Sequence, residues 1–399
     1  MLRLLTAALA LSASAAAQAW TPLPPMSTPR TAAAAAVLVG RLYVVGGQAA
    51  GGEVLRTAEV YTPGTGWAAI APLDDPRAGA RLLVLDGRLY LVGGRDDEGP
   101  EDDMDVFDPA TGDWDSDRSM GEERDGIAAG VVGGRILAIG GADGDGLRGD
   151  SEAFDPAADA WAPTPEWGLE PARAGAGSAS DAGGVVVAGG FSTFGPLSTV
   201  ERFGPGAGSA PLPALPSPRG GAGLAAAGGA LFAVGGRDAA DARLASALRL
   251  DPSATGWAPL TPLPEGREDA AVVALGGDLV VAGGTGAFGS VLASVLRLEG
   301  VAVSGGPAPA SPALRLTLDG PSPARGTVRL SVSSGRPTVA RVDVLDTRGR
   351  LVATLHDGPV YASPERLAWT SGAAPPGLYL VRATTLTGVQ TLRVTTLGR

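Results

Sequence analysis

The sequence predicts an all-β protein: a six-bladed β-propeller followed by a small immunoglobulin-like β-sandwich. Three markers recur in register through six copies of a unit of 46 to 49 residues, and such a period is typical of propellers. A glycine pair closes one strand of each unit, an arginine stands 16 residues before the first glycine, and a tryptophan follows at the same pitch in most units. The glycine pairs begin at Gly46, Gly93, Gly140, Gly189, Gly235 and Gly283.

Each unit contains four short segments that are typical of strands. In the first unit they are "RTAAAAAVLVG", "RLYVVGG", "EVLRTAEVYTP" and "WAAIAPL", bounded by glycine and proline. The first segment has the smallest side chains, which suits a crowded central axis. The tryptophan is large enough to pack between neighbouring units. Because a four-stranded sheet cannot bury both faces alone, we expect the copies to close into a ring.

The order Arg…Gly-Gly…Tyr/Phe-x-Pro…Trp resembles the kelch repeat, over roughly residues 20–300. Six copies of it resemble a six-bladed kelch propeller. Two departures stand out: the fourth unit has no tryptophan near Gly208, and Leu250 and Leu298 replace the aromatic residue in the last two units.

The sixth unit lacks its own tryptophan strand, and the N-terminus offers a replacement. Trp20 precedes Arg30 by 10 residues, just as Trp67 precedes Arg77. We therefore expect "WTPLPPM" to form the outer strand of the last blade and to remove a free sheet edge. The alternative is that "VAVSG", after Gly300, closes that blade.

The two ends of the chain predict export. Residues 1–19 have a positive Arg3, an apolar stretch and a small-residue cleavage site at Ala17-Gln18-Ala19, as in a secretory signal peptide. The alternatives are an uncleaved anchor or a core helix. Residues 20–300 form the propeller and 301–312, rich in proline, glycine and serine, a linker. We expect no transmembrane span in the mature chain, which is secreted or attached to the outer cell surface.

Residues 313–399 consist of short alternating strands with turn signals, including the hairpin "DTRGR", and predict a small β-sandwich. The order "GPSPARGTVRLSV…RVDVLDTRGRLV…GLYLVRATT…GVQTLRVTTLGR" resembles the C-terminal sorting domain of type IX secretion substrates. That resemblance implies secretion machinery as a partner and a domain that is cleaved or used for surface attachment. A plain immunoglobulin-like domain is the alternative.

Composition excludes several classes of function. The 399 residues carry a formal charge of -11, which argues against nucleic acid and anionic membranes as partners. The absence of cysteine excludes disulfides and cysteine-ligated metals, and His356 is the only histidine, so Ser-His-Asp chemistry in the propeller is excluded. The sequence predicts no cofactor, no metal and no catalytic residue.

The repeated arginines are the candidate ligand-binding residues. The first strand of a unit begins, and the second ends, on the same face of a propeller, so these arginines would ring the axis beside the loops that follow the glycine pairs. Guanidinium groups suit carboxylates and sulfates. In the alternative, each arginine bonds the backbone of a neighbouring blade or a carboxylate such as Asp96 or Asp238. The residues are Arg30, Arg77, Arg124, Arg173, Arg219 and Arg267.

Acidic residues give weaker signals. "DGDG" at 143–146 lacks the spacing of a calcium loop, so a solvated loop is the default. A second set recurs two residues before the aromatic position and is therefore interpreted as structural: Glu59, Asp105, Glu152 and Glu201. A third set flanks the arginines and could act in acid–base chemistry, although no pair stands out: Glu122, Glu123, Asp125, Glu268 and Asp269.

These observations predict a secreted or cell-surface binding protein that recognises an extracellular glycan or protein through an arginine-lined propeller face. The alternative is an enzyme acting on acidic sugars, resembling periplasmic kelch sialic-acid mutarotases, with arginine and glutamate as working groups. A purely structural surface protein is the third interpretation.

Overall fold

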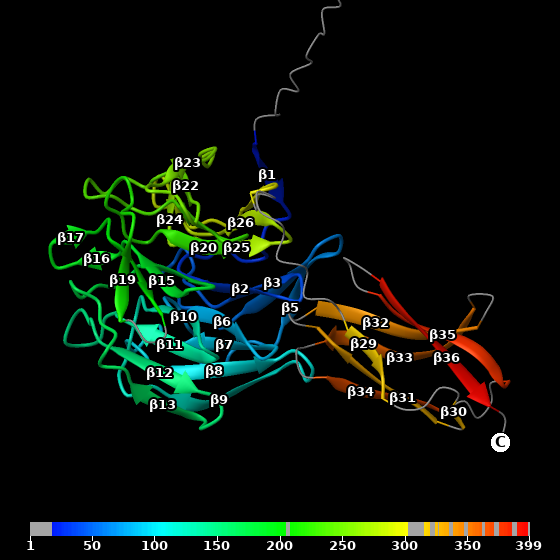
Figure 1. The fold of residues 1–399 in the computed structure, drawn as a ribbon. Coiled ribbons are helices and arrows are strands. Elements are labelled where there is room, and N and C mark those ends of the chain that lie inside the picture. Colours follow the sequence, from blue (N-terminus) through cyan, green and yellow to red (C-terminus); the bar gives the residue numbers. More distant parts are fainter. Residues whose placement is uncertain are drawn as a thin grey trace, which may run out of the picture.

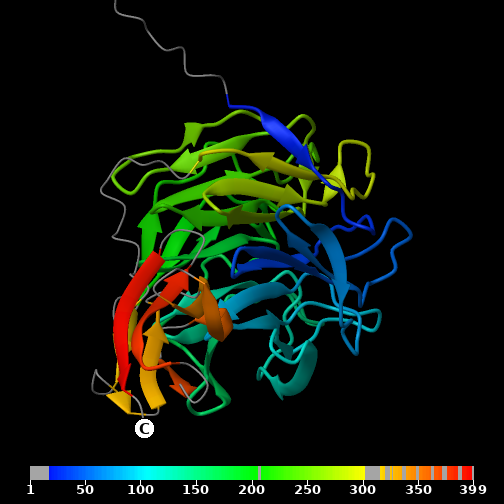
Figure 2. The same ribbon diagram turned by 90° about the vertical axis from the view of Figure 1, so that its right-hand side faces the viewer.

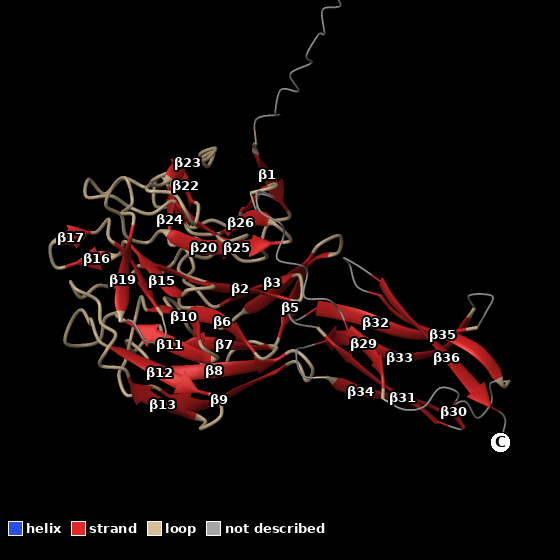
Figure 3. Cartoon of the chain, in the orientation of Figure 1, coloured by secondary structure: helices blue, strands red, loops and turns tan. Residues whose placement is uncertain are grey.

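A computed structural model describes residues 18–204 and 208–301, and the segments 315–319, 324–325, 327–334, 338–346, 350–360, 364–370, 375–384 and 389–397. Every regular element in these ranges is a strand (Figure 3). No helix in them is long and apolar enough to cross a membrane. The predicted signal peptide, apart from its last two residues, and the predicted linker after residue 301 lie outside the described residues.

Between Trp20 and Leu298 the strands form six antiparallel four-stranded sheets. The first sheet contains β2 (Ala34–Leu38), β3 (Arg41–Val45), β4 (Ala58–Thr62) and β5 (Gly66–Ile70). The second contains β6 (Arg81–Leu85), β7 (Arg88–Val92), β8 (Asp103–Asp108) and β9 (Asp113–Ser119). The third contains β10 (Ala128–Val132), β11 (Arg135–Ile139), β12 (Ser151–Asp155) and β13 (Ala160–Pro163).

The other three sheets repeat this plan. The fourth contains β14 (Gly177–Asp181), β15 (Gly184–Ala188), β18 (Val200–Phe203) and β19 (Ser209–Leu212). The fifth contains β20 (Gly223–Ala227), β21 (Ala230–Val234), β22 (Ala247–Leu250) and β23 (Ala258–Pro259). The sixth contains β25 (Ala271–Leu275), β26 (Asp278–Ala282), β28 (Val295–Leu298) and β1 (Trp20–Leu23). Short loop strands form two further pairs: β16 (Phe191–Ser192) with β17 (Gly195–Pro196), and β24 (Arg267–Glu268) with β27 (Thr285–Gly286).

The first strands of the six sheets contact one another in a closed cycle, β2–β6–β10–β14–β20–β25 and back to β2. In Figure 1 these strands lie towards the middle, and the last strands, such as β9, β13 and β23, lie at the periphery. Small residues permit the close approach: a Cβ added at Gly130 would lie 2.8 Å from Val185 of the next sheet. This is the arrangement that the small side chains of the first segments predict.

The glycine pairs join each sheet to the next. The second glycine of every pair donates its N–H to the backbone carbonyl of the next repeat arginine, from Gly47 to Arg77 (2.7 Å) through to Gly284 and Arg30 (2.9 Å). The first glycine has a left-handed backbone, and a Cβ at Gly46 would lie 2.0 Å from the Arg77 carbonyl oxygen. Only glycine fits a position that combines positive φ with this contact.

The N-terminal strand completes the sixth sheet. β1 pairs antiparallel with β28, with Trp20 opposite Leu298. This is the pairing that the spacing from Trp20 to Arg30 predicts. The Trp20 indole donates to the Thr261 carbonyl of the fifth sheet (2.9 Å), and Trp67 donates in the same way to Pro24 (2.8 Å). The tryptophans thus bridge neighbouring sheets, and β1 covers the edge of β28 that would otherwise be open. Figure 2 shows β1 in dark blue beside the yellow strands of that sheet.

The C-terminal segment folds as two sheets around one core. One sheet contains β29 (Arg315–Leu318), β31 (Thr327–Ser333) and β34 (Glu365–Thr370). The other contains β30 (Ala324–Arg325), β36 (Val389–Leu397), β35 (Gly377–Thr384), β32 (Thr338–Leu345) and β33 (Leu351–Val360). Alternating residues of both sheets form the shared core, including Leu330 and Trp369 from one sheet and Val342 and Tyr379 from the other.

Candidate functional site

The structure corrects the prediction that the repeated arginines line an accessible face. All six side chains are buried, with exposed fractions between 0% and 3%, and are therefore out of reach of a ligand at the surface. The residues are Arg30, Arg77, Arg124, Arg173, Arg219 and Arg267.

The arginines instead hold the backbone of their own sheet. Arg30 Nη1 donates to the carbonyl of Gly46 (2.7 Å), and Arg267 Nη1 donates to Gly283 (3.1 Å). The equivalent bond forms in the second, third and fifth sheets as well. The structural alternative therefore describes these residues better, with one change. The side chain bonds its own sheet, whereas the backbone N–H and carbonyl of the arginine bond the preceding sheet.

Their charge partners differ between sheets. In the first four sheets each arginine faces the recurring carboxylate, as in Arg30–Glu59 (2.7 Å) and Arg124–Glu152 (3.2 Å). These are the acids that we interpreted as structural, and the predicted partners Asp96 and Asp238 are not among them. In the fifth sheet Arg219 bonds the hydroxyl of Ser246 (2.7 Å) instead. Burial lowers the pKa of Arg219 below its ordinary value.

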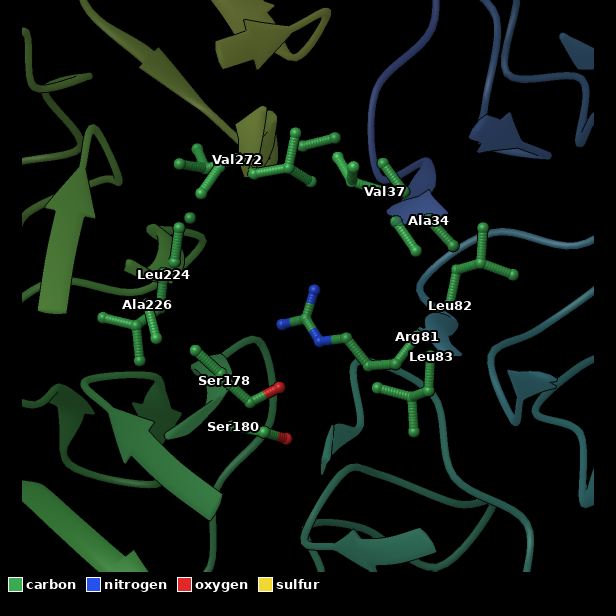
Figure 4. A pocket seen from close by; sticks show the side chains of 18 of the residues that line it. Ala34, Val37, Arg81, Leu82, Leu83, Ser178, Ser180, Leu224, Ala226 and Val272 are labelled. Carbon is green, nitrogen blue, oxygen red and sulfur yellow. The ribbon is translucent and has the colours of Figure 1, made fainter. Parts of the chain in front are cut away.

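A cavity of about 330 Å³ runs between the first strands of the sheets. It is lined mainly by alanine, valine and leucine side chains, with Ser178 and Ser180 on one side. Figure 4 shows that Arg81 points into its open centre. The other five sheets have alanine or glycine at the position of Arg81, such as Ala34 and Gly223. The cavity therefore contains one guanidinium group in otherwise small surroundings.

A narrow ring of backbone closes one end of this channel. It is formed by the residues two positions after each repeat arginine, all in the left-handed region with φ between 51° and 69°: Ala32, Gly79, Gly126, Gly175, Gly221 and Asp269. Hydrogen bonds link five of the six neighbouring pairs, as from Ala32 N–H to Asp269 O (2.9 Å) and from Asp269 N–H to Gly221 O (2.8 Å). Only about 50 Å³ of open space remains at this neck.

Charged and aromatic side chains gather on the outer side of the neck, which we call the mouth. Glu268 lies between Arg237 (2.8 Å) and Arg243 (2.9 Å), and the Arg95 guanidinium lies 3.4 Å from Asp125. The Arg237 guanidinium also stands 4.9 Å from the centre of the Phe191 ring, within the range of a cation–π contact. Arg95, Phe191 and Arg237 each come directly after a glycine pair, whereas Asp125 and Glu268 each come directly after a repeat arginine.

Asp269 completes the mouth cluster, which comprises Arg95, Asp125, Phe191, Arg237, Arg243, Glu268 and Asp269. Burial among protein atoms, helped by the charge of Glu268, raises the pKa of Asp269 to about 6, although Arg81 and Arg237 oppose the shift. The residue as a whole is nevertheless exposed to solvent. Burial also raises the pKa of Asp125 above its ordinary value. The mouth therefore holds one carboxyl group, that of Asp269, that can exchange its proton in mildly acidic solution.

Two phenylalanines project from the loops around the mouth. Phe194 and Phe288 have exposed fractions of 92% and 103%, and each stands four residues after the second glycine of its pair. They come from the fourth and sixth sheets, on either side of the loop that carries Arg237. Fully exposed aromatic rings of this kind are typical of binding surfaces.

The structure separates the acidic candidates. Asp125, Glu268 and Asp269 reach the mouth, but Glu122 pairs with Arg148 (2.9 Å). In the "DGDG" loop, Asp143 accepts the backbone N–H groups of residues 145 and 146 and also pairs with Arg148. Within the described ranges, no three acidic or histidine side chains are grouped to hold a metal ion.

Sequence reasoning missed Arg81, Arg95, Arg237 and the phenylalanines of the mouth, because none of them recurs through the units. Arg81 carried a detectable signal, since it is the only arginine in the six first strands.

Comparisons with known proteins agree with this architecture. A family model described as "Kelch motif" matches residues 29–66 and 76–121. A solved structure titled "Structure of YjhT" is similar with a TM-score of 0.60 and 18% identity, over 69% of this chain and 96% of that chain. No curated protein matches the chain. The motifs and the structural likeness support a kelch-type β-propeller, and at this identity the likeness shows the fold alone.

Proposed function

We propose that the chain is an exported binding protein that recognises a glycan through the mouth of a six-bladed propeller. The six sheets are the blades, and residues 313–399 form an immunoglobulin-like domain for sorting or attachment. The mouth cluster takes the place of the six buried arginines as the recognition surface. Binding needs no catalytic group, and the paired charges and exposed rings of the mouth suffice for it.

The observation that carries this proposal is the combination of exposed rings with paired charges. Phe194 and Phe288 offer flat apolar surfaces on which the C–H face of a sugar ring can stack. Arg237, whose side chain is partly exposed and held by the buried Glu268, can donate to sugar hydroxyls, and the partly exposed Asp125 beside Arg95 can accept from them. Because arginines and carboxylates alternate in the mouth, the surface suits a polyhydroxylated ligand with few charges better than a polyanion.

A glycan array probed with the purified mature chain tests the proposal. We expect binding to a defined set of glycans, with at least a tenfold loss of affinity for Arg237→Ala and for the double variant Phe194→Ala/Phe288→Ala. Arg88→Ala is the matched control, since Arg88 is an exposed arginine at the start of β7, at the opposite end of its sheet from the glycine pair, and is paired with Asp108. Equal glycan binding by all variants would reject the mouth as the binding site. If the chain bound no glycan and bound a protein instead, a glycan would be rejected as the class of ligand.

The second candidate, an enzyme acting on acidic sugars, is favoured by one observation. Asp269 has a pKa raised to about 6 and lies near Asp125 and the guanidinium of Arg237. A carboxyl of this kind can act as a general acid or base, while an arginine holds a sugar carboxylate. NMR measurement of anomer exchange in a sialic acid tests this candidate. Catalysis that Asp269→Asn abolishes would establish it, and exchange at the uncatalysed rate would reject it.

Export and attachment form a separate part of the proposal. Its support is the leader-like composition of residues 1–19 and the two-sheet unit after residue 313. Mass spectrometry of the secreted form should find a first residue near Trp20. Deletion of residues 313–399 should leave the propeller inside the outer membrane. A full-length protein retained in the cytoplasm would contradict both assignments.

A further inference from the structure

The guanidinium of Arg81 is enclosed without a charge partner. Its Nη2 donates to the carbonyl of Ala176 (2.5 Å) across the channel, and its Nε is buried with no hydrogen-bond partner in the described structure. Among the described residues no carboxylate lies within ion-pair distance of Arg81. The negative charge of Asp269 raises the pKa of Arg81, but from a greater distance. Nη1, which also carries two hydrogens, has no recorded acceptor among them either.

Arg81 stays charged in this setting. Burial lowers its pKa, but an arginine side chain starts from such a high value that it keeps its proton at neutral pH. A partly buried charge with unused donors is costly, and such groups are usually paired or bound to a counterion. The channel therefore contains a positive charge and open space next to it, but the protein supplies no anion there.

The space beside Arg81 is large enough for a small organic anion, and its lining suits one. The cavity of about 330 Å³ has mainly apolar walls, and Leu83 lies on the same side of it as the stem of Arg81 in Figure 4. Ser180 lies on the same side as Ser178, and its hydroxyl accepts from the N–H of Val131 (2.7 Å), which leaves its own proton available to an acceptor in the channel. The planar donor fork of an arginine matches the two oxygens of a carboxylate.

We propose that the central channel binds a small monocarboxylate, with its two oxygens on the Arg81 guanidinium and its short apolar end among the valine and leucine side chains. This site is distinct from the glycan-binding mouth, because the neck of backbone separates the two. The two proposals can be rejected independently. Arg237→Ala tests glycan binding at the mouth, and substitutions of Arg81 test carboxylate binding in the channel.

The test is a titration of the mature chain with acetate, propionate, butyrate and chloride at constant pH and ionic strength, followed by calorimetry and by the thermal midpoint. We expect the carboxylates to raise the midpoint with concentration, since they bind the folded state. Arg81→Gln should weaken carboxylate binding at least tenfold, whereas Arg81→Lys should retain part of it because it keeps the charge and loses the fork. Arg88→Ala should bind like the unmodified protein.

Three outcomes would overturn the proposal: no carboxylate-dependent shift in the unmodified protein, equal shifts in the Arg81→Gln variant, or a chloride effect as large as that of the carboxylates. If the Arg81 variants do not fold, crystals of the unmodified protein grown with 3-bromopropionate decide the matter. An anomalous bromine peak in the channel beside Arg81 supports the proposal, and its absence rejects it.

Discussion

At the scale of single residues, the buried repeat arginine cross-links neighbouring segments of the chain. Arg30 combines bonds to two backbone carbonyls, of Gly46 and Thr57, with an ion pair to Glu59. The other oxygen of Glu59 accepts the N–H of Ser27, which follows the outer strand of the preceding sheet. One buried ion pair therefore ties residues 27–30, which follow the outer strand of the preceding sheet, to Gly46 and to residues 57–59 of the first sheet.

This contact gives a prediction for Glu59. Its replacement by alanine leaves the Arg30 charge buried and unpaired, so we expect the free energy of unfolding to fall by about 3–5 kcal/mol. Glu59→Gln should cost less, because it keeps hydrogen-bonding capacity. Ser246→Ala removes the neutral partner of Arg219 in the fifth sheet, and about 1 kcal/mol is expected there. Urea unfolding of the three variants checks this order, and equal losses would contradict it.

At the scale of elements, the contact between sheets depends on the first glycine of each pair. A Cβ at Gly235 would lie 2.3 Å from the backbone oxygen of Arg267 in the next sheet. Backbone cannot move aside as a side chain can, so the two sheets would have to separate. Gly64 also has a left-handed backbone, but open space surrounds it.

The pair Gly235→Ala and Gly64→Ala separates steric contact from backbone strain. Both introduce alanine at positive φ, which costs about 1 kcal/mol. Only the first forces two sheets apart, and we expect its loss to exceed that of Gly64→Ala by a further 1–3 kcal/mol, as for overpacked cores. Thermal unfolding followed by circular dichroism measures the difference. Similar midpoints for the two variants would show that the sheets adjust without strain.

At the scale of the whole molecule, acids with shifted pKa values give the stability an unusual pH dependence. Burial raises the pKa of Asp105 to about 6 and that of Glu101 to about 7. Burial opposes the shift of Asp150, but hydrogen bonds from Arg148 and Arg124 lower its pKa to about 2. Asp105 and Glu101 therefore bind their protons more tightly in the folded chain than in the unfolded chain. Asp150 binds its proton less tightly in the folded chain.

The sign of each shift predicts where stability is greatest. Acids with a raised pKa stabilise the fold when protonated, so their contribution is lost as the pH rises from about 4 to about 7. Acids with a lowered pKa add stability as the pH rises from about 2 to about 4. We therefore expect a maximal thermal midpoint near pH 4–5, and a flatter decline above it in Asp105→Asn. A maximum above pH 7 would contradict these assignments.

The sequence was informative where a feature repeats. The pitch of the glycine pairs predicted four-stranded units, and the position of Trp20 predicted the strand that completes the last sheet. The same periodicity misled the site prediction, since recurrence of an arginine does not say whether its side chain points to solvent or into the sheet. Phe194 and Arg237 lie in loops that differ from unit to unit, so only the three-dimensional structure brings them together.

The pairing of β1 with β28 also governs the order in which the chain can fold. The strand that is synthesised first finds its partner only after some 270 further residues have been added. Until then the nascent sixth sheet lacks a strand, and its open edge can accept β1 from another molecule. Crowded synthesis would therefore favour strand-exchanged dimers, in which each molecule completes the other's ring.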